Sequence, residues 1–343
     1  MSHLSNTNLS IIRRFVSKDD IVIVGVLNWG LGHAARSIPL IDWLCTFCQK
    51  VIIASDGEAL DLLRSQYPLL PSFILPSYGI EYKYNDIAFN VFASSFKVFQ
   101  AINKEKKLAH HIAKETGATV IISDNRLGFK SQFTKNIYLT HQVNILHRNL
   151  LVSKLGTRLH GYFIDSFDHS LIPDFEGEQS LCPSLSYSSN PFYSYIGPLT
   201  RIQKLNITLE YDLLVLLSGP EPQRTIFEKL IWKQLSKLKQ YKICMAGTKS
   251  LLHNPDFPHI YIKPLQNSKE VEFLLNASKL LIARSGYTTL MDIFGLDIKA
   301  IFVPTPGQSE QEYLAKFHSK NPKYIFLNQN ELNKLEKTIT CLI

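Results

Sequence analysis

The sequence predicts an α/β protein built from two Rossmann-like units in series, and three observations lead to that prediction. First, the chain has 343 residues, 45% of them hydrophobic and 19% charged, which exceeds the usual size of one core and supplies enough apolar surface for two. Second, short β-branched runs alternate with segments of helical periodicity in both halves. Third, the composition between residues 183 and 206 shifts to Pro, Ser, Asn and Tyr, which marks a boundary.

The first half opens with a polar segment, residues 1–20, which we expect to be a tail, and continues as a domain over residues 21–195. Residues 21–26 form a β-branched run, typical of a strand buried on both faces. A glycine loop follows, and apolar side chains then recur at helical spacing over residues 34–48. The later strands of this half are predicted at residues 51–54, 119–122 and 136–139.

The second half, residues 196–343, repeats the same alternation. Its strands are predicted at residues 213–217, 241–245, 280–283 and 300–303. Strands that alternate with helices in this way indicate a parallel sheet with helices on both faces.

Charge and cysteine content limit the classes of partner and the compartment. The chain carries 37 Lys and Arg against 29 Asp and Glu, a net charge of +8, which favours anionic partners. The basic residues are scattered and no nucleic-acid-binding motif occurs, so we expect no nucleic acid partner. Five cysteines make no disulfide framework in a chain of this length. Without a signal peptide or a membrane-spanning run, we expect a cytoplasmic protein that either stays in solution or rests on the inner face of a membrane.

The most informative stretch lies in the second half, where Arg284-Ser285-Gly286 precedes a helical pattern that contains Asp292. A helix that begins at Ser285 or Gly286 directs free N–H groups and its positive end toward an anion. A second loop rich in amide and carboxylate side chains, residues 304–313, follows the next predicted strand. Together they suit a phosphate and sugar hydroxyls; the alternative is a solvated turn between strand and helix.

Residues 284–315 resemble the donor-binding half of nucleotide-sugar glycosyltransferases with the GT-B fold, particularly the family 28, MurG-like branch. Residues 28–36, with Gly30-x-Gly32-His33, resemble that family's N-terminal glycine-rich loop. The resemblance implies two Rossmann-like domains that face a central cleft. It also implies a nucleotide-diphosphate sugar, most simply a UDP-sugar, as co-substrate, with no further cofactor.

The resemblance further implies roles for residues in the donor half. Asp292 stands where the family usually has a ribose-binding Glu, and Glu310 and Gln311 stand where it places two side chains on the sugar hydroxyls. Gln308 stands where several relatives carry an acid. The predicted donor contacts are Gly30, Gly32, Ser218, Gly219, Arg224, Arg284, Ser285, Gly286, Thr288, Asp292, Gln308, Glu310 and Gln311.

The loop from Ser218 to Arg224 follows a predicted buried strand and precedes a helix, where open α/β sheets bind phosphate. Arg224 and Arg284 are the candidate cations beside a diphosphate. Because Pro220 and Pro222 remove two backbone donors, an ordinary turn is an equal alternative here.

In the first half, His33 lies in the first turn of the predicted helix, where the helix dipole disfavours imidazolium and keeps a neutral ring available as a base. Inverting transfer needs such a base on the acceptor hydroxyl. Asp124 ends a buried strand and resembles the aspartate that pairs with the loop histidine in GT-B relatives; a helix cap or turn is the alternative. His141 and Gln142 are either acceptor ligands or packed side chains.

An aromatic stripe, Phe89, Phe92, Phe96 and Phe99, precedes a basic segment and either contacts an anionic membrane or packs in the core. No Asp-x-Asp or other metal-binding spacing occurs, so we expect no metal. The sequence thus predicts an inverting, metal-independent glycosyltransferase that uses a nucleotide-diphosphate sugar, with an unknown acceptor that is lipid-linked or a glycan. The alternatives are 2-epimerisation or hydrolysis of UDP-N-acetylglucosamine on the same fold, or non-catalytic binding of a nucleotide sugar.

Overall fold

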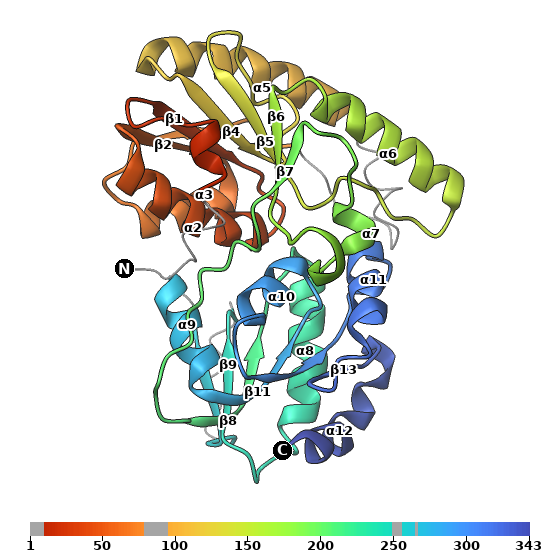
Figure 1. Cartoon of the computed structure of the whole chain (residues 1–343). Helices are drawn as coiled ribbons and strands as arrows, with labels where there is room; N and C mark the ends of the chain where they lie inside the picture. The colour runs from red at the N-terminus through yellow and green to blue at the C-terminus, as the bar shows by residue number, and fades with distance from the viewer. Residues whose placement is uncertain (1–9, 79–94, 249–255, 265–266) are drawn as a thin grey trace. The chain divides into compact units, whose positions relative to one another are not determined.

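The computed structural model describes residues 10–78, 95–248, 256–264 and 267–343. It divides into two compact units, Met1–Thr200 and Arg201–Ile343. Each unit is built on one sheet of parallel strands (Figure 1). The predicted α/β class is therefore confirmed, and the division falls near the boundary predicted at residue 196.

Among the described residues of the first unit, the sheet has the strand order β3-β2-β1-β4-β5-β6-β7. Its strands are β1 (Ile21–Val26), β2 (Lys50–Ser55), β3 (Ser72–Ile74), β4 (Val120–Asp124), β5 (Lys135–Leu139), β6 (His169–Ile172) and β7 (Tyr193–Tyr195). Its helices are η1 (Ile12–Arg14), α2 (Gly32–Phe47), α3 (Gly57–Gln66), α5 (Ser95–Thr116), α6 (Leu150–Ile164), η2 (Gly177–Gln179) and α7 (Pro183–Ser186).

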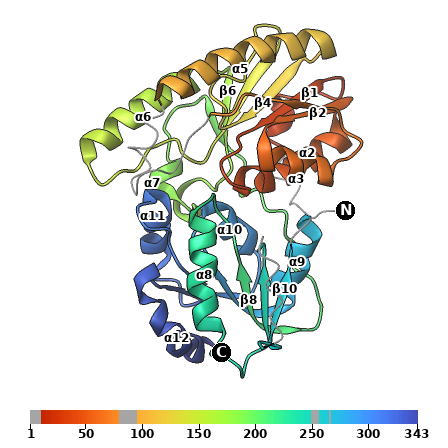
Figure 2. The same cartoon turned by 180° about the vertical axis from the view of Figure 1, so that it is seen from behind.

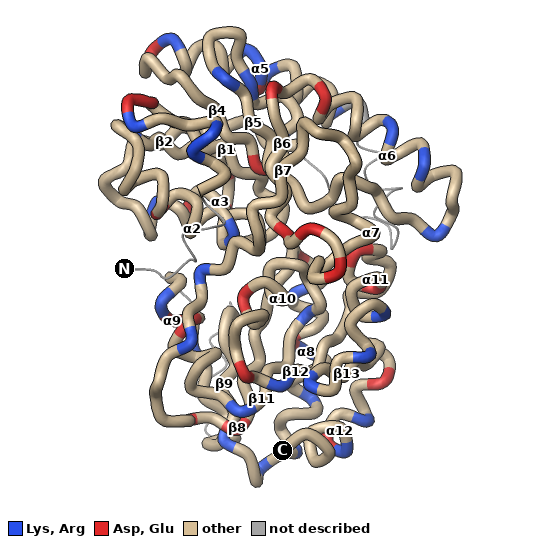
Figure 3. The backbone as a smooth tube through the Cα atoms, in the orientation of Figure 1, with Lys and Arg blue, Asp and Glu red and all other residues tan. Residues whose placement is uncertain are grey.

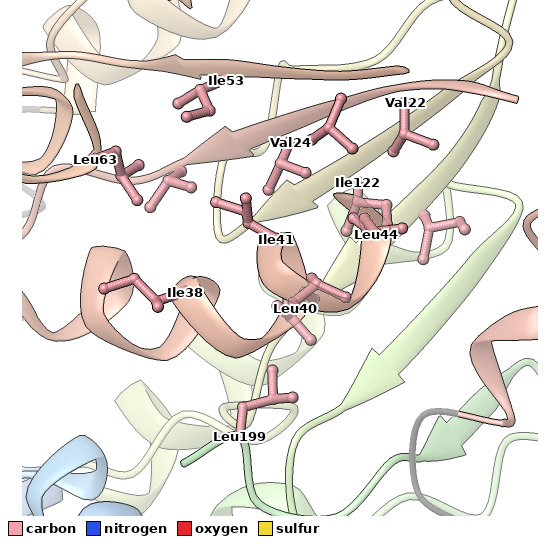
Figure 4. Packing of buried hydrophobic residues seen from close by; sticks show 14 of the residues in the cluster. Val22, Val24, Ile38, Leu40, Ile41, Leu44, Ile53, Leu63, Ile122 and Leu199 are labelled. Carbon is pink, nitrogen blue, oxygen red and sulfur yellow. The ribbon is translucent and has the colours of Figure 1, made fainter. Parts of the chain in front are cut away.

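Alternate residues of the central strands face two separate apolar layers. Val22 and Val24 of β1 pack with Ile38, Ile41 and Leu44 of α2 on one face (Figure 4). The intervening side chains of β1 and β4 pack against α5 on the other face. A strand with both faces covered must be apolar at nearly every position, which is the pattern that the sequence showed.

The expectation of a polar tail over residues 1–20 needs correction for its second half. Ile12 in η1 and Val16 are buried, and both belong to the apolar layer beneath α2 and α3. They are scattered among polar residues, so the run resembles a tail, but burial of two large aliphatic side chains fixes it to the unit.

Among the described residues of the second unit, the sheet order is β10-β9-β8-β11-β12-β13. The strands are β8 (Tyr211–Leu216), β9 (Ile243–Ala246), β10 (Ile260–Lys263), β11 (Ser278–Ala283), β12 (Lys299–Phe302) and β13 (Tyr324–Phe326). The helices are α8 (Gln223–Leu235), α9 (Ser268–Asn276), α10 (Tyr287–Ile293), α11 (Ser309–His318), η3 (Gln329–Lys334) and α12 (Leu335–Leu342). Figures 1 and 2 show α8 and α10 on opposite faces of this sheet.

Both sheets reverse their strand order at one point, and that point positions the site. In the first unit the chain moves outward from β1 to β3 and then returns to β4, which pairs with β1 so that Val26 lies opposite Asp124. In the second unit β8 and β11 adjoin in the same way, with Leu216 opposite Ala283. Ligands of open α/β sheets bind beyond the carboxyl ends of the strands at such a point.

Candidate active site

In the first unit, His33 and Asp124 meet at the point where the sheet reverses. His33 is the second residue of α2, which follows β1, and Asp124 is the last residue of β4. Their contact joins His33 Nδ1 to Asp124 Oδ1 over 2.9 Å. Asp124 is fully buried, whereas 14% of the His33 side chain is exposed. The pairing predicted from the sequence is therefore present.

Two further residues of α2, which the sequence analysis missed, hold the Asp124 carboxylate. Arg36 donates from Nε to Asp124 Oδ2 over 2.9 Å and from Nη2 to Oδ1, and the Ser37 hydroxyl donates to Oδ2 over 3.0 Å. Arg36 and Ser37 lie three and four positions after His33, the spacing that places side chains on one helix face. That spacing is the signal that could have found them.

These contacts set the charge of both partners. Burial raises the pKa of Asp124, but the charge of Arg36, the charge of His33 when its ring is protonated, and the hydrogen bonds from both residues outweigh it and hold that pKa well below the usual range. Burial and the nearby Arg36 lower the pKa of His33, and Asp124 opposes them only in part. At neutral pH, Asp124 is thus a carboxylate that accepts the Nδ1 proton of a neutral His33, which leaves the lone pair on Nε2.

His141 belongs to the same cluster through Arg36. His141 Nδ1 lies 2.7 Å from Arg36 Nη1, and because guanidinium only donates, Nδ1 is the acceptor and the proton of a neutral ring sits on Nε2. His141 is buried. The neighbouring Gln142 is partly exposed, and its backbone N–H donates to Thr140 Oγ1 over 3.0 Å. In this structure His141 is therefore a packed side chain. The acceptor-binding roles of His141 and Gln142 stay predictions.

A second buried network lies at the carboxyl ends of β1 and β2. Arg126, two residues after Asp124, pairs with Glu105 of α5 and donates to Asp56 over 2.6 Å. It also donates to the carbonyl of Val26 over 3.1 Å. The guanidinium thereby joins the carboxyl ends of β1 and β2 to α5, and its charge is matched within the unit.

In the second unit, the end of β11 leads into α10 as predicted, but the helix begins at Tyr287 with Gly286 as its N-cap. Asp292, the predicted ribose ligand, is buried and forms an ion pair with Arg201, whose Nε lies 3.5 Å from Asp292 Oδ2. Arg201 was not among the predicted residues. The Arg201 guanidinium is therefore the charge partner of this buried carboxyl group.

The loop after β12 is organised by the residues that were predicted to bind the sugar. Gln311 is buried, and its Oε1 accepts from the backbone N–H of Thr305 over 2.8 Å. The Ser285 hydroxyl donates to the Gln311 carbonyl over 3.0 Å, and Glu310 Oε1 accepts from the N–H of Tyr287 over 3.4 Å. Predicted residues from two distant segments therefore lie together, with Thr288 and Gln308 partly exposed beside them.

The predicted role of Arg284 as a diphosphate cation is wrong in this structure. Its side chain is 1% exposed, and its guanidinium donates to the carbonyls of Val303, Pro304 and Gln223 and to Gln329 Oε1. The group also stacks 4.2 Å from the centroid of the Phe227 ring. Burial lowers its pKa to about 10, so it stays charged, but Nη1 and Nη2 donate within the unit, and the buried Nε has no hydrogen-bond partner among the described residues.

The loop between β8 and α8 is still the predicted diphosphate site, but Arg224 makes an ion pair within the loop. Arg224 donates to Glu221 Oε1 from Nε over 3.0 Å and from Nη2 over 2.8 Å, so its charge is paired within the loop. Gly219 has a φ of +98°, and nothing lies within 4 Å of where its Cβ would be. A glycine is required there by conformation and leaves open space beside Ser218.

Other expectations concern metal and membrane. Across the described ranges, no group of three His, Cys, Asp or Glu side chains is placed to hold a metal ion, and metal independence stays a prediction. None of the described helices is both long and apolar enough to span a bilayer. Of the aromatic stripe, Phe89 and Phe92 lie outside the described residues, while Phe99 on α5 is exposed.

The fold is the GT-B fold of glycosyltransferases. The glycotransferase of kitacinnamycin aligns with a TM-score of 0.66 at 12% identity, covering 95% of this chain and 91% of that one. The spinosyn rhamnosyltransferase SpnG, complexed with thymidine diphosphate, aligns with a TM-score of 0.62 at 13% identity, covering 94% and 92%. MurG of Acinetobacter baumannii aligns with a TM-score of 0.54 at 13% identity, covering 94% and 93%.

Sequence comparison adds the family of the second unit. Residues 240–343 match the model of the glycosyltransferase family 28 C-terminal domain. No curated protein matches the chain. The second unit therefore contains a family 28 C-terminal domain and the chain has the GT-B fold, which confirms the resemblance inferred from its two motifs.

Proposed function

We propose that the chain transfers a sugar, with inversion and without a metal ion, from a nucleotide-diphosphate sugar to an acceptor hydroxyl. The observation that carries the proposal is the pairing of His33 Nδ1 with the ionised Asp124, which leaves a neutral His33 with its lone pair on Nε2. A ring held in that tautomer by a buried carboxylate is prepared to act as a general base.

In the proposed reaction, His33 Nε2 takes the proton of the acceptor hydroxyl as the acceptor oxygen attacks the anomeric carbon. The bond from that carbon to the diphosphate breaks on the opposite side, so the nucleotide diphosphate leaves and the configuration inverts. Asp124 stabilises the imidazolium that forms, and Arg36 keeps Asp124 in place.

The second unit holds the donor in this proposal. Asp292 binds the ribose hydroxyls, Glu310 and Gln311 face the transferred sugar, and the loop beside Gly219 receives the diphosphate. Support comes from the family 28 domain over residues 240–343 and from the thymidine diphosphate complex of SpnG. The nucleotide is proposed to be uridine diphosphate, and the thymidine nucleotide is the competing choice.

The proposed location is the cytoplasm, with contact at the inner face of a membrane, and the acceptor is lipid-linked or a glycan. All five cysteines are free, which supports a reducing compartment. Thermal shift with UDP and dTDP identifies the nucleotide, because only a bound ligand raises the melting point.

Incubation with labelled UDP-sugars then tests the reaction. Transfer to an acceptor that is unaffected by a chelator supports the proposal. Release of free sugar, formation of a 2-epimer, or binding without turnover each contradicts it and favours one of the alternatives.

A further inference from the structure

Helix α6 carries its apolar side chains on the outside of the first unit. Leu151, Leu155, Leu159 and Tyr162 recur at positions i, i+4, i+8 and i+11, so they form one stripe along the helix. Each is more than half exposed, from 59% for Leu159 to 77% for Leu151. Leu150 beside them is also exposed.

The opposite face of α6, which packs on the unit, is small and polar along the middle of the helix, and its apolar contacts lie at the C-terminal end, where Ile164 is buried and Phe163 is partly buried. Ser153 Oγ donates to the Ile145 carbonyl over 2.5 Å, and the Ile145 N–H donates to Thr157 Oγ1 over 2.9 Å. A Cβ added at Gly156 would lie 3.2 Å from Ile145, so the two segments are already in close contact there. The inner contacts hold α6 in place without the outer leucines, so the leucines lie on the solvent side of the helix rather than on the side that packs on the unit.

The charged side chains around the stripe are mainly basic, and the exposed Asp165 at the C-terminal cap of α6 is an acidic exception. Residues 125–164 contain no Asp or Glu, and Lys154 and Arg158 of α6 and Arg148 just before it are exposed. Figure 3 shows Lys and Arg, and no Asp or Glu, along α6. An apolar stripe bordered by cations is the composition of a helix that lies in the headgroup region of an anionic membrane.

We propose that the outer face of α6 docks the first unit on an anionic lipid surface, with the leucine stripe among the acyl chains and the basic residues on the headgroups. This inference specifies the membrane contact that is part of the proposed function. A second copy of the chain fits less well, because it would bring Lys154 and Arg158 against the same cations of its partner.

Flotation of the full chain with phosphatidylcholine vesicles, with and without phosphatidylglycerol, tests the docking. We expect binding only to the vesicles that contain phosphatidylglycerol, and release as salt is raised. Lys154→Glu with Arg158→Glu should weaken partitioning by about 25-fold or more, since each basic residue contributes about fivefold. Leu155→Ser with Leu159→Ser should weaken it by about 100-fold.

The controls separate the surface from nonspecific effects. Leu69→Ser removes a leucine that is 94% exposed elsewhere on the first unit, and Lys237→Glu with Lys239→Glu makes the same charge change on the exposed surface of the second. Neither should alter flotation. Because every substituted α6 side chain is exposed, the variants should keep the parent's melting temperature.

Binding that is equal for both vesicle types, or that survives the two leucine substitutions, overturns the proposal. The proposal is also overturned if the parent binds no vesicles and sedimentation velocity shows a dimer that the leucine substitutions dissociate. That result would assign the face to a second copy of the chain. The nucleotide thermal shift of the same variants should equal that of the parent. A parent chain that binds UDP but floats with neither vesicle type therefore refutes the docking alone, and a parent chain that floats but does not bind UDP refutes the donor proposal alone.

Discussion

The buried pair of Arg36 and Asp124 gives a prediction that follows directly from the geometry beneath His33. Both side chains are essentially inaccessible, at 1% and 0% exposure, and the guanidinium makes two hydrogen bonds to the carboxylate. Removing one partner of such a pair leaves a buried charge uncompensated and costs about 3–5 kcal/mol. Arg36→Met and Asp124→Asn should each destabilise the first unit by about that amount.

The double variant should cost much less than the sum of the two. Additive effects would reach about 6–10 kcal/mol, but the double variant has no buried charge left, so we expect about 4 kcal/mol or less and a coupling of at least about 2 kcal/mol. The exposed pair of His111 and Glu115 on α5 is the matched control. A cycle on that pair should show a coupling below about 0.5 kcal/mol.

Urea unfolding measured by tryptophan fluorescence is the assay. The chain has three tryptophans, of which Trp29 and Trp43 lie in the first unit and Trp232 in the second. A Trp232→Phe background therefore reports the first unit alone. Additive costs in the Arg36 and Asp124 cycle would show that the two charges do not compensate each other, and the description of the site would be wrong.

Three further predictions follow. The acid limb of kcat/KM should have its midpoint below the ordinary histidine pKa of about 6.5, because burial and Arg36 lower the pKa of His33 and activity is lost only as pH falls through that lowered value; a midpoint above about 7 in a pH–rate profile contradicts this. Asp124 has a lowered pKa, so its contribution to stability should persist above the ordinary aspartate pKa of about 3.9 and be lost only as pH falls below it. The free energy of unfolding of Asp124→Asn and of the parent, each measured against pH, tests this, and curves of the same shape refute it. Arg284→Met should lower the stability of the second unit by about 2 kcal/mol or more and leave nucleotide affinity unchanged. Asp292→Ala should weaken nucleotide binding, and calorimetric titration of both variants with the nucleotide measures the two affinities. A larger loss of affinity in Arg284→Met than in Asp292→Ala would return Arg284 to the donor site.

The central strands could be predicted from the sequence because burial on both faces makes them continuous apolar runs. The predictions at residues 21–26 and 280–283 fall on β1 and β11. The strands that the sequence did not reveal include β3, β7, β10 and β13 at the sheet edges. None of the residues of β3, β7 or β13 is fully buried, so these strands lack the apolar run that marks the central ones.

The candidate site could be predicted where a residue type and its place in the topology agree. His33 follows β1 and Asp124 ends the neighbouring β4, so the parallel order brings them together. Arg36 was missed because an arginine inside a helix reads as a surface residue until its buried partner is known. Arg284 was misjudged for the opposite reason. Its position after β11 suits a ligand contact, and only the acceptors around it show that Nη1 and Nη2 already donate within the unit.

The central claim is that His33 supplies the base for transfer, and the single-turnover rate of His33→Gln tests it most directly. With donor and acceptor saturating, we expect a rate about 10²–10⁴-fold below that of the parent, the usual contribution of a general base, with nucleotide affinity unchanged. A rate within about twofold of the parent, at equal nucleotide affinity, would contradict that claim.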